Sequence, residues 1–351
     1  MKLKAMAKIN LGLDVIGRRE DGYHQVRMIM QTIRMFDQLE IEKSSTPGIR
    51  LSVNLPYVPT DSGNLVYRAA SLLMEEFSIQ EGVDIRLNKF IPVAAGMAGG
   101  SSDAAAALVG VNHLFDLGLS RKELMERGLR LGADVPYCVM RGTALAEGIG
   151  EKLTRLPALP SCYILIGKPG ISVSTKYVYT NLKLDARTEH PDIDGIIEAL
   201  ENQDLGGVTG KMGNVLESVT IPRYPVIEKI KELMKAEGAL NALMSGSGPT
   251  VFGIFDDRKT AERAQQKLRD SVSSASEARR ERIAVVCGGT EESVEDLVQR
   301  AGQLNSERVV LLAPGDDGCL LAAAVAGAIA GESDAALPLS GAELKGVSQT
   351  Q

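Results

Sequence analysis

The chain has 351 residues, of which 44% are hydrophobic and 24% charged, and its formal net charge is −6 at pH 7. This composition is typical of a soluble globular protein, and the length allows two ordinary domains or one large domain with additions. The acidic balance offers no basic surface for nucleic acid, and the absence of tryptophan argues against a base-stacking platform for single strands.

The chain start and the cysteines predict the compartment. "MKLKAMAKIN" lacks the continuous apolar core of a signal peptide, and "LLAAAVAGAIAG" is shorter than the roughly 18 residues of a spanning helix. The cysteines are Cys138, Cys162, Cys287 and Cys319. Their scattered spacing favours reduced thiols over a disulfide framework or a zinc site. We therefore expect a cytoplasmic protein that binds neither a membrane nor nucleic acid.

The first part of the chain mixes strands and helices. Alternating side chains predict strands at 39–43 and 49–55, and helical spacing predicts a helix over 61–77 that Asp61 or Ser62 would cap. A strand pattern follows from residue 83 and leads into a glycine-rich stretch. Two helices are expected beyond it, one to about Leu117 and one around 120–132. Pro136 disfavours a continuous helix after that.

The second part of the chain also mixes predicted strands and helices. "CYILIGKPGISVST" predicts a buried strand and a loop, and residues 224–238 predict an amphipathic helix that ends at Gly238. "ALMSGSGPTVFGIF" predicts a strand–loop–strand unit, and residues 259–272 a further helix. From Ser271 the polar "SVSSASEARRER" is typical of a linker. Beyond it we expect a strand in "IAVVCGG", a helix over 292–305 and a frayed end.

The glycine-rich stretch "PVAAGMAGGSSDAAAAL", residues 92–108, has two interpretations. Small residues before a helix let a phosphate reach the exposed N–H groups and the positive end of the helix dipole. Asp103 is expected in the first turn. The alternative is a tight strand-to-helix turn whose helix packs on a sheet. The stretch matches neither GxxxxGK[ST], since Lys89 precedes it, nor GxGxxG.

Other segments offer polar groups. Lys8 and Asn10 share a face of a predicted strand, where a solvent-facing edge lysine is the commoner case. Tyr23 and His24 offer a ring and a polar edge, although isolated surface histidines are common. Asp134 in "LGADVPYCV" has the position of a cap or turn residue. "MSGSGPTVFG" is a second glycine–serine loop or a hairpin.

These segments, in this order, resemble the GHMP kinase superfamily of galactokinase, homoserine kinase and mevalonate kinase over residues 1–270. The resemblance includes "AKINLGLDVIGRREDGYH", "GTALAEGIGE", "KPGISVSTKYVY" and "GNVLE". It implies an α/β (α+β) two-domain fold, with a ribosomal S5 domain 2-like N-terminal half, a ferredoxin-like C-terminal half and the site in the cleft between them. The implied units are 1–155 and 156–272, with 273–351 as a linker and appended tail.

The resemblance also implies a reaction. "AKINL…DGYH" with "LGADVP" resembles the members that use ATP to phosphorylate the 2-hydroxyl of a cytidylated methylerythritol in the non-mevalonate isoprenoid pathway. It implies that Asp134 is the catalytic base, with Lys8 beside it. Nucleotide chemistry further implies Mg²⁺, for which the sequence assigns no ligands.

The implied contacts fall into two sets. The expected ATP-binding residues are Pro92, Gly96, Met97, Ala98, Gly99, Gly100, Ser101 and Ser102, with Asn64 near the adenine. The expected substrate-binding residues are Asn10, Tyr23, His24, Ser172, Thr175 and Tyr177, of which Tyr177 would form a second wall for the cytosine.

Two alternatives stay open from the sequence. One is a GHMP kinase for homoserine or mevalonate, and the other is a non-catalytic ligand-binding relative. The segment after about residue 272 lies outside the kinase pattern and weakly resembles part of phage tail-sheath-like proteins. We expect it to have no catalytic role, although "RIAVVCGG" is a candidate for a missing edge strand.

Overall fold

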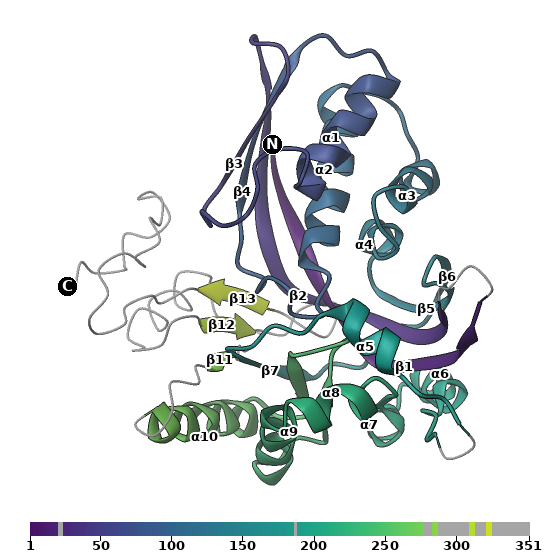
Figure 1. Ribbon diagram of the computed structural model, residues 1–351, viewed down its shortest axis with the longest axis vertical. Coiled ribbons are helices and arrows are strands. Elements are labelled where there is room, and N and C mark those ends of the chain that lie inside the picture. Colours follow the sequence, from purple (N-terminus) through teal and green to yellow (C-terminus); the bar gives the residue numbers. More distant parts are fainter. Residues whose placement is uncertain (20–23, 186–187, 277–282, 287–308, 313–320, 325–351) are drawn as a thin grey trace.

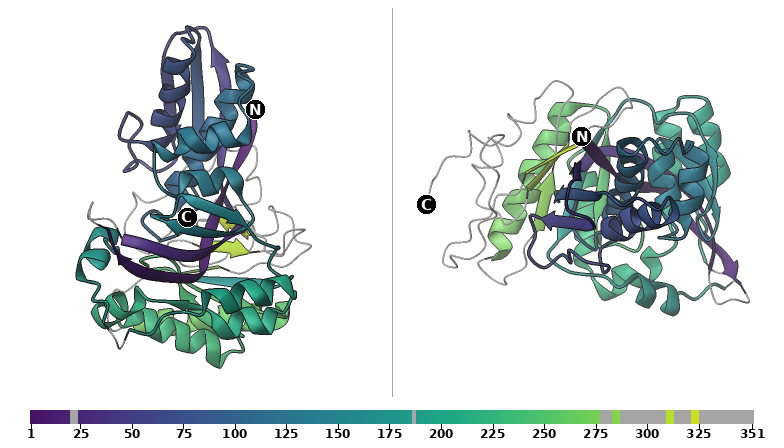
Figure 2. Two further views of the ribbon diagram at one scale, coloured as in Figure 1. Left: turned by 90° about the vertical axis from the view of Figure 1, so that its right-hand side faces the viewer. Right: turned by 90° about the horizontal axis from the view of Figure 1, so that it is seen from above.

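The structure is a computed structural model that describes residues 1–19, 24–185, 188–276, 283–286, 309–312 and 321–324. Two layered parts adjoin each other, and the long strands β1 and β2 run between them (Figures 1 and 2). The predicted helix at 292–305, the predicted frayed end, Cys287, Cys319 and Tyr23 lie outside the described residues.

The first sheet is built on two long antiparallel strands. They are β1 (Lys2–Arg18) and β2 (His24–Ser44). The sheet has the order β3-β4-β2-β1-β8, while β5 pairs with β2 and β6 with β5. Its other strands are β3 (Ile49–Val53), β4 (Gly82–Asn88), β5 (Thr143–Gly148), β6 (Lys152–Arg155) and β8 (Gly213–Asn214).

Helices cover one face of this sheet (Figure 1). They are α1 (Leu65–Glu76), α2 (Gly99–Leu114), α3 (Arg121–Leu129) and α4 (Val135–Met140). The alanines of α2 are buried, and a Cβ atom at Gly110 would lie 2.8 Å from Leu3 Cδ1 and 3.1 Å from Ile41 Cγ2. Small residues therefore bring α2 close to β1 and β2, as the packing interpretation of the glycine-rich stretch predicts.

The second sheet has the order β13-β12-β11-β7-β10-β9. Its strands are β7 (Tyr163–Pro169), β9 (Asn241–Met244), β10 (Val251–Phe255), β11 (Ile283–Val286), β12 (Val309–Leu312) and β13 (Leu321–Ala324). The remaining helices are α5 (Thr175–Asn181), α6 (Ile193–Glu201), α7 (Leu205–Lys211), α8 (Glu217–Arg223), α9 (Val226–Ala236) and α10 (Arg258–Ser276).

The two sheets share a hydrophobic core. Ile9 and Leu11 of β1 pack in one buried cluster with Ile166 and Phe252 of the second sheet. Helices α9 and α10 contact the strands of that sheet, and Figure 2 shows them along its outer side. Because side chains alternate along a strand, this packing turns Lys8 and Asn10 of β1 to the opposite face. No helix in the described ranges combines the length and apolarity needed to cross a membrane.

Several local predictions are corrected. Asn64, rather than Asp61 or Ser62, is the N-cap of α1, since its side chain accepts from Val66 N. The prediction for Pro136 holds, because no continuous helix runs through this segment: the short α4 ends at Met140, and Pro136 lies in its first turn, where the missing N–H costs no helical bond. "SVSSAS" continues α10 instead of forming a linker. Gly238 follows the C-cap of α9, as predicted.

The described part of the tail extends the second sheet. β11 pairs antiparallel with β7, with Ile283 opposite Pro169 and Val286 opposite Ile166. "IAVV" therefore pairs beside β7, where the sequence suggested an edge strand, but it is not the edge, because β12 and β13 continue the sheet beyond it. β6 ends at Arg155 and β7 begins at Tyr163, while the division into units at 155 and 272 stays a prediction.

Candidate active site

A cavity of about 1050 Å³ lies where the two parts of the fold meet. Its walls come from β1, β2, the start of α2, the loop before α4, helix α5 and the loop between β9 and β10. Predicted site residues that line it are Lys8, Asn10, His24, Gly96, Ala98, Ser101, Asp134 and Thr175. The fold thus brings together residues that lie up to 167 positions apart in the chain.

The glycine-rich loop opens onto this cavity at the start of α2. Gly96 has a φ of +72°, and Ala98, the N-cap residue, has a φ of +54°. A Cβ atom at Gly96 would lie only 2.2 Å from the carbonyl oxygen of Ser245, so the contact between the two glycine–serine loops requires glycine. Ser101 lines the cavity in the first turn of the helix. The arrangement leaves the unpaired N–H groups of that turn available to an anion.

Other residues of the glycine-rich loop hold it in this conformation through hydrogen bonds to β1. The Met97 carbonyl accepts the backbone N–H of Lys8 at 3.1 Å, and the Ser102 hydroxyl donates to the Met6 carbonyl at 2.6 Å. Met97, Ser102 and Pro92 are buried. The side chain of Ser102 is therefore committed to β1, which leaves Ser101 as the hydroxyl that faces the cavity.

Lys8 is buried at the cavity wall, contrary to the solvent-facing alternative. Its Nζ donates to Asn10 Oδ1 at 2.7 Å and to the Gly96 carbonyl at 3.0 Å. β1 shows register shifts on either side of this pair, and such irregularities redirect side chains near functional sites. Burial lowers the pKa of Lys8, while the charge of Asp134 acts to raise it. The ammonium group thus lies in the field of the Asp134 carboxylate.

Asp134 is half-buried at the N-cap position of α4, where its side chain makes no capping hydrogen bond. Its backbone carbonyl accepts from Cys138 N, as the helix requires. The cap interpretation of Asp134 therefore holds for the backbone only, and the carboxylate lines the cavity. Lys8 and Asp134 together provide a cation and a base at one place.

Aromatic rings meet at another part of the cavity. The rings of His24 and Tyr179 lie 5.1 Å apart between centroids, at 43° to each other, and both residues line the cavity. Burial raises the pKa of the Tyr179 hydroxyl. Desolvation and the nearby Arg18 lower the pKa of His24, which favours the neutral imidazole. Tyr179 was missed in the sequence, where its spacing of four from Thr175 places both on one helical face.

Three predicted residues lie elsewhere. Tyr177 packs against Arg223, whose guanidinium carbon lies 4.6 Å from the ring centroid, and it does not line the cavity, whereas Tyr179 does. Ser172 is exposed and does not line the cavity. Asn64 also lies outside the lining, with its amide donating to Pro59 O, although the adjacent Leu65 is 3.7 Å from a Cβ placed at Gly100. The sequence did not reveal these local partners.

The second glycine–serine loop is braced by "GNVLE". Asn214 donates through Nδ2 to the carbonyls of Met244 and Gly246, each at 2.8 Å. Glu217 Oε1 accepts from Met244 N at 2.8 Å. Ser247 in this loop bonds Thr175 at 2.8 Å, which ties the loop to α5. These contacts fix the loop against the cavity.

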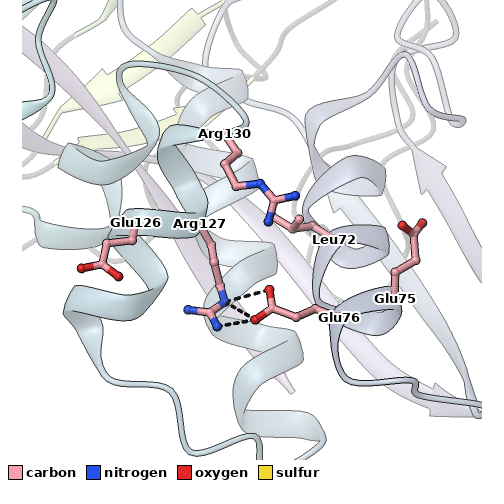
Figure 3. A pocket seen from close by; sticks show the side chains of 6 residues that line it. All are labelled: Leu72, Glu75, Glu76, Glu126, Arg127 and Arg130. Carbon is pink, nitrogen blue, oxygen red and sulfur yellow. Dashed lines mark hydrogen bonds and ion pairs between the residues drawn. The ribbon is translucent and has the colours of Figure 1, made fainter.

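A smaller pocket lies between α1 and α3, with a volume of about 560 Å³. Figure 3 shows its charged lining, in which the guanidinium of Arg127 pairs with Glu76. Its lining residues are Leu72, Glu75, Glu76, Glu126, Arg127 and Arg130. These differ from the predicted site residues, so we place the chemistry in the larger cavity.

Comparison with known proteins identifies the family. The family models described as GHMP kinases N terminal domain and GHMP kinases C terminal match residues 64–142 and 196–274. The chain is 59% identical over 269 residues to 4-diphosphocytidyl-2-C-methyl-D-erythritol kinase of Lachnospira eligens, covering 77% of this chain and 93% of that protein. This chain belongs to the GHMP kinase family. It is accordingly a small-molecule kinase.

Further relatives of this GHMP kinase carry the same name. Identity is 54% over 269 residues to the protein of Clostridium perfringens, covering 77% of this chain and 93% of that one. A crystal structure of 4-(cytidine 5'-diphospho)-2C-methyl-D-erythritol kinase superposes with a TM-score of 0.68 at 36% identity, covering 77% of this chain and 96% of that one. A homoserine kinase from Cytophaga hutchinsonii has a TM-score of 0.67 at 20% identity, covering 81% and 93%, and shows the shared fold alone. The fold prediction is confirmed.

Proposed function

We propose that this protein transfers the γ-phosphoryl group of ATP to the 2-hydroxyl group of 4-diphosphocytidyl-2-C-methyl-D-erythritol, in the non-mevalonate route to isoprenoids. The observation that carries the proposal is a single cavity lined by Lys8, Asp134, the start of α2 and the His24–Tyr179 ring pair. The names of the relatives at 51% to 60% identity support the same substrate.

In the proposed mechanism Asp134 acts as the base. Its carboxylate accepts the proton of the 2-hydroxyl group while the hydroxyl oxygen attacks the γ-phosphorus. The bond from the γ-phosphorus to the β,γ-bridging oxygen breaks, and ADP leaves with that electron pair. Lys8 stabilises negative charge on the transferred group, because its ammonium is held in place by Asn10 and the Gly96 carbonyl.

The first turn of α2 would bind the phosphates of ATP. Backbone N–H groups at residues 98–101 and the dipole of the helix favour a polyanion there. Ser101 would add a hydroxyl at the same place. We retain Asn64 near the adenine as a proposal, because its neighbour Leu65 lies beside Gly100.

Mg²⁺ would neutralise the phosphate charge when bound. It is held by oxygen ligands, usually one or two carboxylates together with substrate phosphates. Asp134 and Ser101 offer such oxygens in the cavity, so the residues fit the ion. In the described ranges no group of three or more His, Cys, Asp or Glu forms a ready metal site, which agrees with an ion that arrives with the nucleotide.

The ring pair would hold the cytosine. Tyr179 offers a face for stacking, and the neutral imidazole of His24 offers both a donor and an acceptor to the polar edge of the base. Asn10 and Thr175 would line the path from the base to the reacting hydroxyl. We place the enzyme in the cytoplasm, where ATP is available and where a thiol such as that of Cys138 stays reduced.

A coupled assay of ADP release tests the proposal. We expect turnover with the cytidylated methylerythritol, and little with homoserine or mevalonate at equal concentration. Preference for homoserine or mevalonate would instead assign another GHMP activity. Silence with all three alcohols, in a chain that still binds ADP, would indicate a non-catalytic binder.

A further inference from the structure

Three buried charged side chains form a cluster behind the glycine-rich loop. Lys89 Nζ is bonded to Asp37 Oδ2 and, at 2.6 Å, to Asp103 Oδ2. The three residues are only 5%, 0% and 3% exposed. They come from different elements, since Asp37 belongs to β2, Lys89 follows β4 and Asp103 belongs to α2.

The cluster fixes the chain that enters and leaves the loop. Asp37 Oδ1 accepts the backbone N–H groups of Phe90 and Ile91, the latter at 2.7 Å. A Cβ atom at Gly99 would lie 3.2 Å from Lys89 Nζ and 3.0 Å from Ile91 Cγ2. Lys89 therefore lies directly against the first residue of α2, and it is bonded to the same helix at Asp103.

We propose that Lys89 is a positioning residue for the nucleotide phosphates, which acts through Asp37 and Asp103 to hold the N-terminal turn of α2 in place. The inference rests on the proposed function, because it assigns the phosphates of ATP to that turn. Lys89 itself does not line the cavity, so it acts through the helix and not by contact with the nucleotide.

The charge balance of the cluster supports this role. Burial together with the charge of Asp37 raises the pKa of Asp103 well above its ordinary value, which favours the neutral carboxyl group. Burial alone would lower the pKa of Lys89, but Asp37 and Asp103 outweigh it and raise the pKa. Because Lys89 lies between the two carboxyl groups and the pKa of Asp103 is raised, the cluster places less negative charge behind a turn that receives phosphates than two free carboxylates would.

Stability alone does not account for such a cluster. Well-packed apolar residues usually stabilise a core at least as well as buried ion pairs, whose desolvation is unfavourable. Asp103 Oδ1 also has no hydrogen-bond partner among the described residues, so the cluster is not optimised for bonding. Its geometric consequence is a fixed relation between β2, the loop entry and α2.

The test compares Asp103→Ala with Asp103→Asn. Alanine removes the bond from Lys89 to α2, whereas asparagine keeps an acceptor for Lys89 and adds a donor toward Asp37. We measure binding of ADP and of adenosine by calorimetry, and the KM for ATP, the KM for the alcohol and kcat by ADP release. For Asp103→Ala we expect ADP affinity to fall about tenfold and the KM for ATP to rise in parallel. Adenosine affinity and the KM for the alcohol should change less than twofold.

The measurements distinguish a failure of the role proposed for Lys89 from a failure of the proposed function. Asp103→Asn should restore ADP affinity to within about twofold of the original chain. Equal loss of ADP and adenosine binding in Asp103→Ala, or unchanged ADP binding, would overturn the role of Lys89 while leaving the kinase proposal intact. An original chain that neither binds ADP nor turns over would overturn the proposed function. If Asp103→Ala does not fold, Asp103→Ser, whose hydroxyl is too short to reach Lys89, replaces it in the same comparison.

Discussion

Ser245 Oγ donates a hydrogen bond of 3.0 Å to the carbonyl oxygen of Gly96, a residue 149 positions earlier in the chain. The same oxygen accepts from Lys8 Nζ at 3.0 Å. A loop of the C-terminal half therefore helps to set the position of the lysine that we place at the reacting phosphate. The carbonyl of Gly96 therefore bonds side chains from both parts of the fold.

Removal of the Ser245 hydroxyl should impair catalysis beyond its effect on stability. Ser245→Ala loses one buried hydrogen bond, so we expect the free energy of unfolding to fall by about 1 kcal/mol. We also expect kcat to fall about tenfold, since small displacements of catalytic groups are costly. Ser218→Ala, which removes a hydroxyl bonded to Val215 O at 2.7 Å, is the control. Equal kcat values in the two variants would contradict the positioning of Lys8 by Ser245.

Asp134→Asn should abolish transfer and spare nucleotide binding. The amide cannot accept the hydroxyl proton, so we expect kcat to fall by about 10²–10⁴-fold. Asp204→Asn is a matched control, because Asp204 is also an N-cap residue without a side-chain capping bond and lies on the surface. Single-turnover phosphoryl transfer and ADP calorimetry are the measurements. Full turnover in Asp134→Asn would remove Asp134 from the mechanism.

Lys8 should give the reaction an alkaline limit below that of an ordinary lysine. Burial lowers its pKa from 10.5 in the folded chain, so the ammonium loses its proton at a lower pH. We expect kcat/KM to decline with rising pH before 10.5 is reached, and Lys8→Arg to shift that decline upward because a guanidinium stays charged. An alkaline limb that is unchanged in Lys8→Arg would assign it to another group.

The same pKa shift fixes the sign of a stability effect. The charged form of Lys8 is disfavoured in the fold, so its unfavourable contribution disappears as the pH rises from the folded pKa toward 10.5. The free energy of unfolding of the original chain should therefore rise relative to that of Lys8→Met across this interval. Denaturant titrations at several pH values measure the difference, and a fall would contradict the direction of the shift.

Tyr177 and Tyr179 should differ sharply in their effect on the substrate. Loss of a base-stacking ring costs about 1–3 kcal/mol, so we expect Tyr179→Ala to raise the KM for the cytidylated alcohol by about 5–150-fold. The KM for ATP should stay unchanged. Tyr177→Ala removes a ring that packs on Arg223, and it should leave both KM values near the original. The reverse pattern would restore Tyr177 as the cytosine wall.

Shortened chains should show that the tail contributes to stability and not to catalysis. Ending the chain at Ser276 removes β11 and exposes the edge of β7, so we expect a lower Tm and a greater tendency to aggregate. A chain that ends at residue 290 keeps β11 on β7 but loses β12 and β13, so its Tm should lie between that of the Ser276 truncation and the original Tm. We expect kcat per folded molecule to be equal in both, and a specific loss of kcat on shortening would give the tail a role in the site.

Sequence patterns predicted the features that depend on residues close together in the chain. The alternation along "AKIN" placed Lys8 and Asn10 on one face, and their hydrogen bond of 2.7 Å confirms it. The small residues of the glycine-rich stretch predicted a close approach, which the contacts of Gly96 and the buried alanines of α2 bear out. Such features follow from strand and helix periodicity together with side-chain size.

Tertiary partners could not be read from the sequence. Asp103 was expected in the first turn of α2, but it lies in the second turn and is buried against Lys89. Tyr177 and Tyr179 are two residues apart on one short helix, and only the packing of α5 decides which one faces the cavity. These outcomes depend on residues distant in the chain.

The long strand pair β1–β2 sets the distance between the two ends of the proposed substrate site. Asn10 lies opposite Met30, and Arg18 lies opposite His24, so six residues of β2 separate the two levels. At about 3.3 Å of rise per residue the separation is about 20 Å. An alcohol as short as homoserine cannot span it and gains nothing from the distal rings. Selection by length would thus depend on the backbone hydrogen bonds that fix the β1–β2 pair, as well as on the rings at the far end of the site.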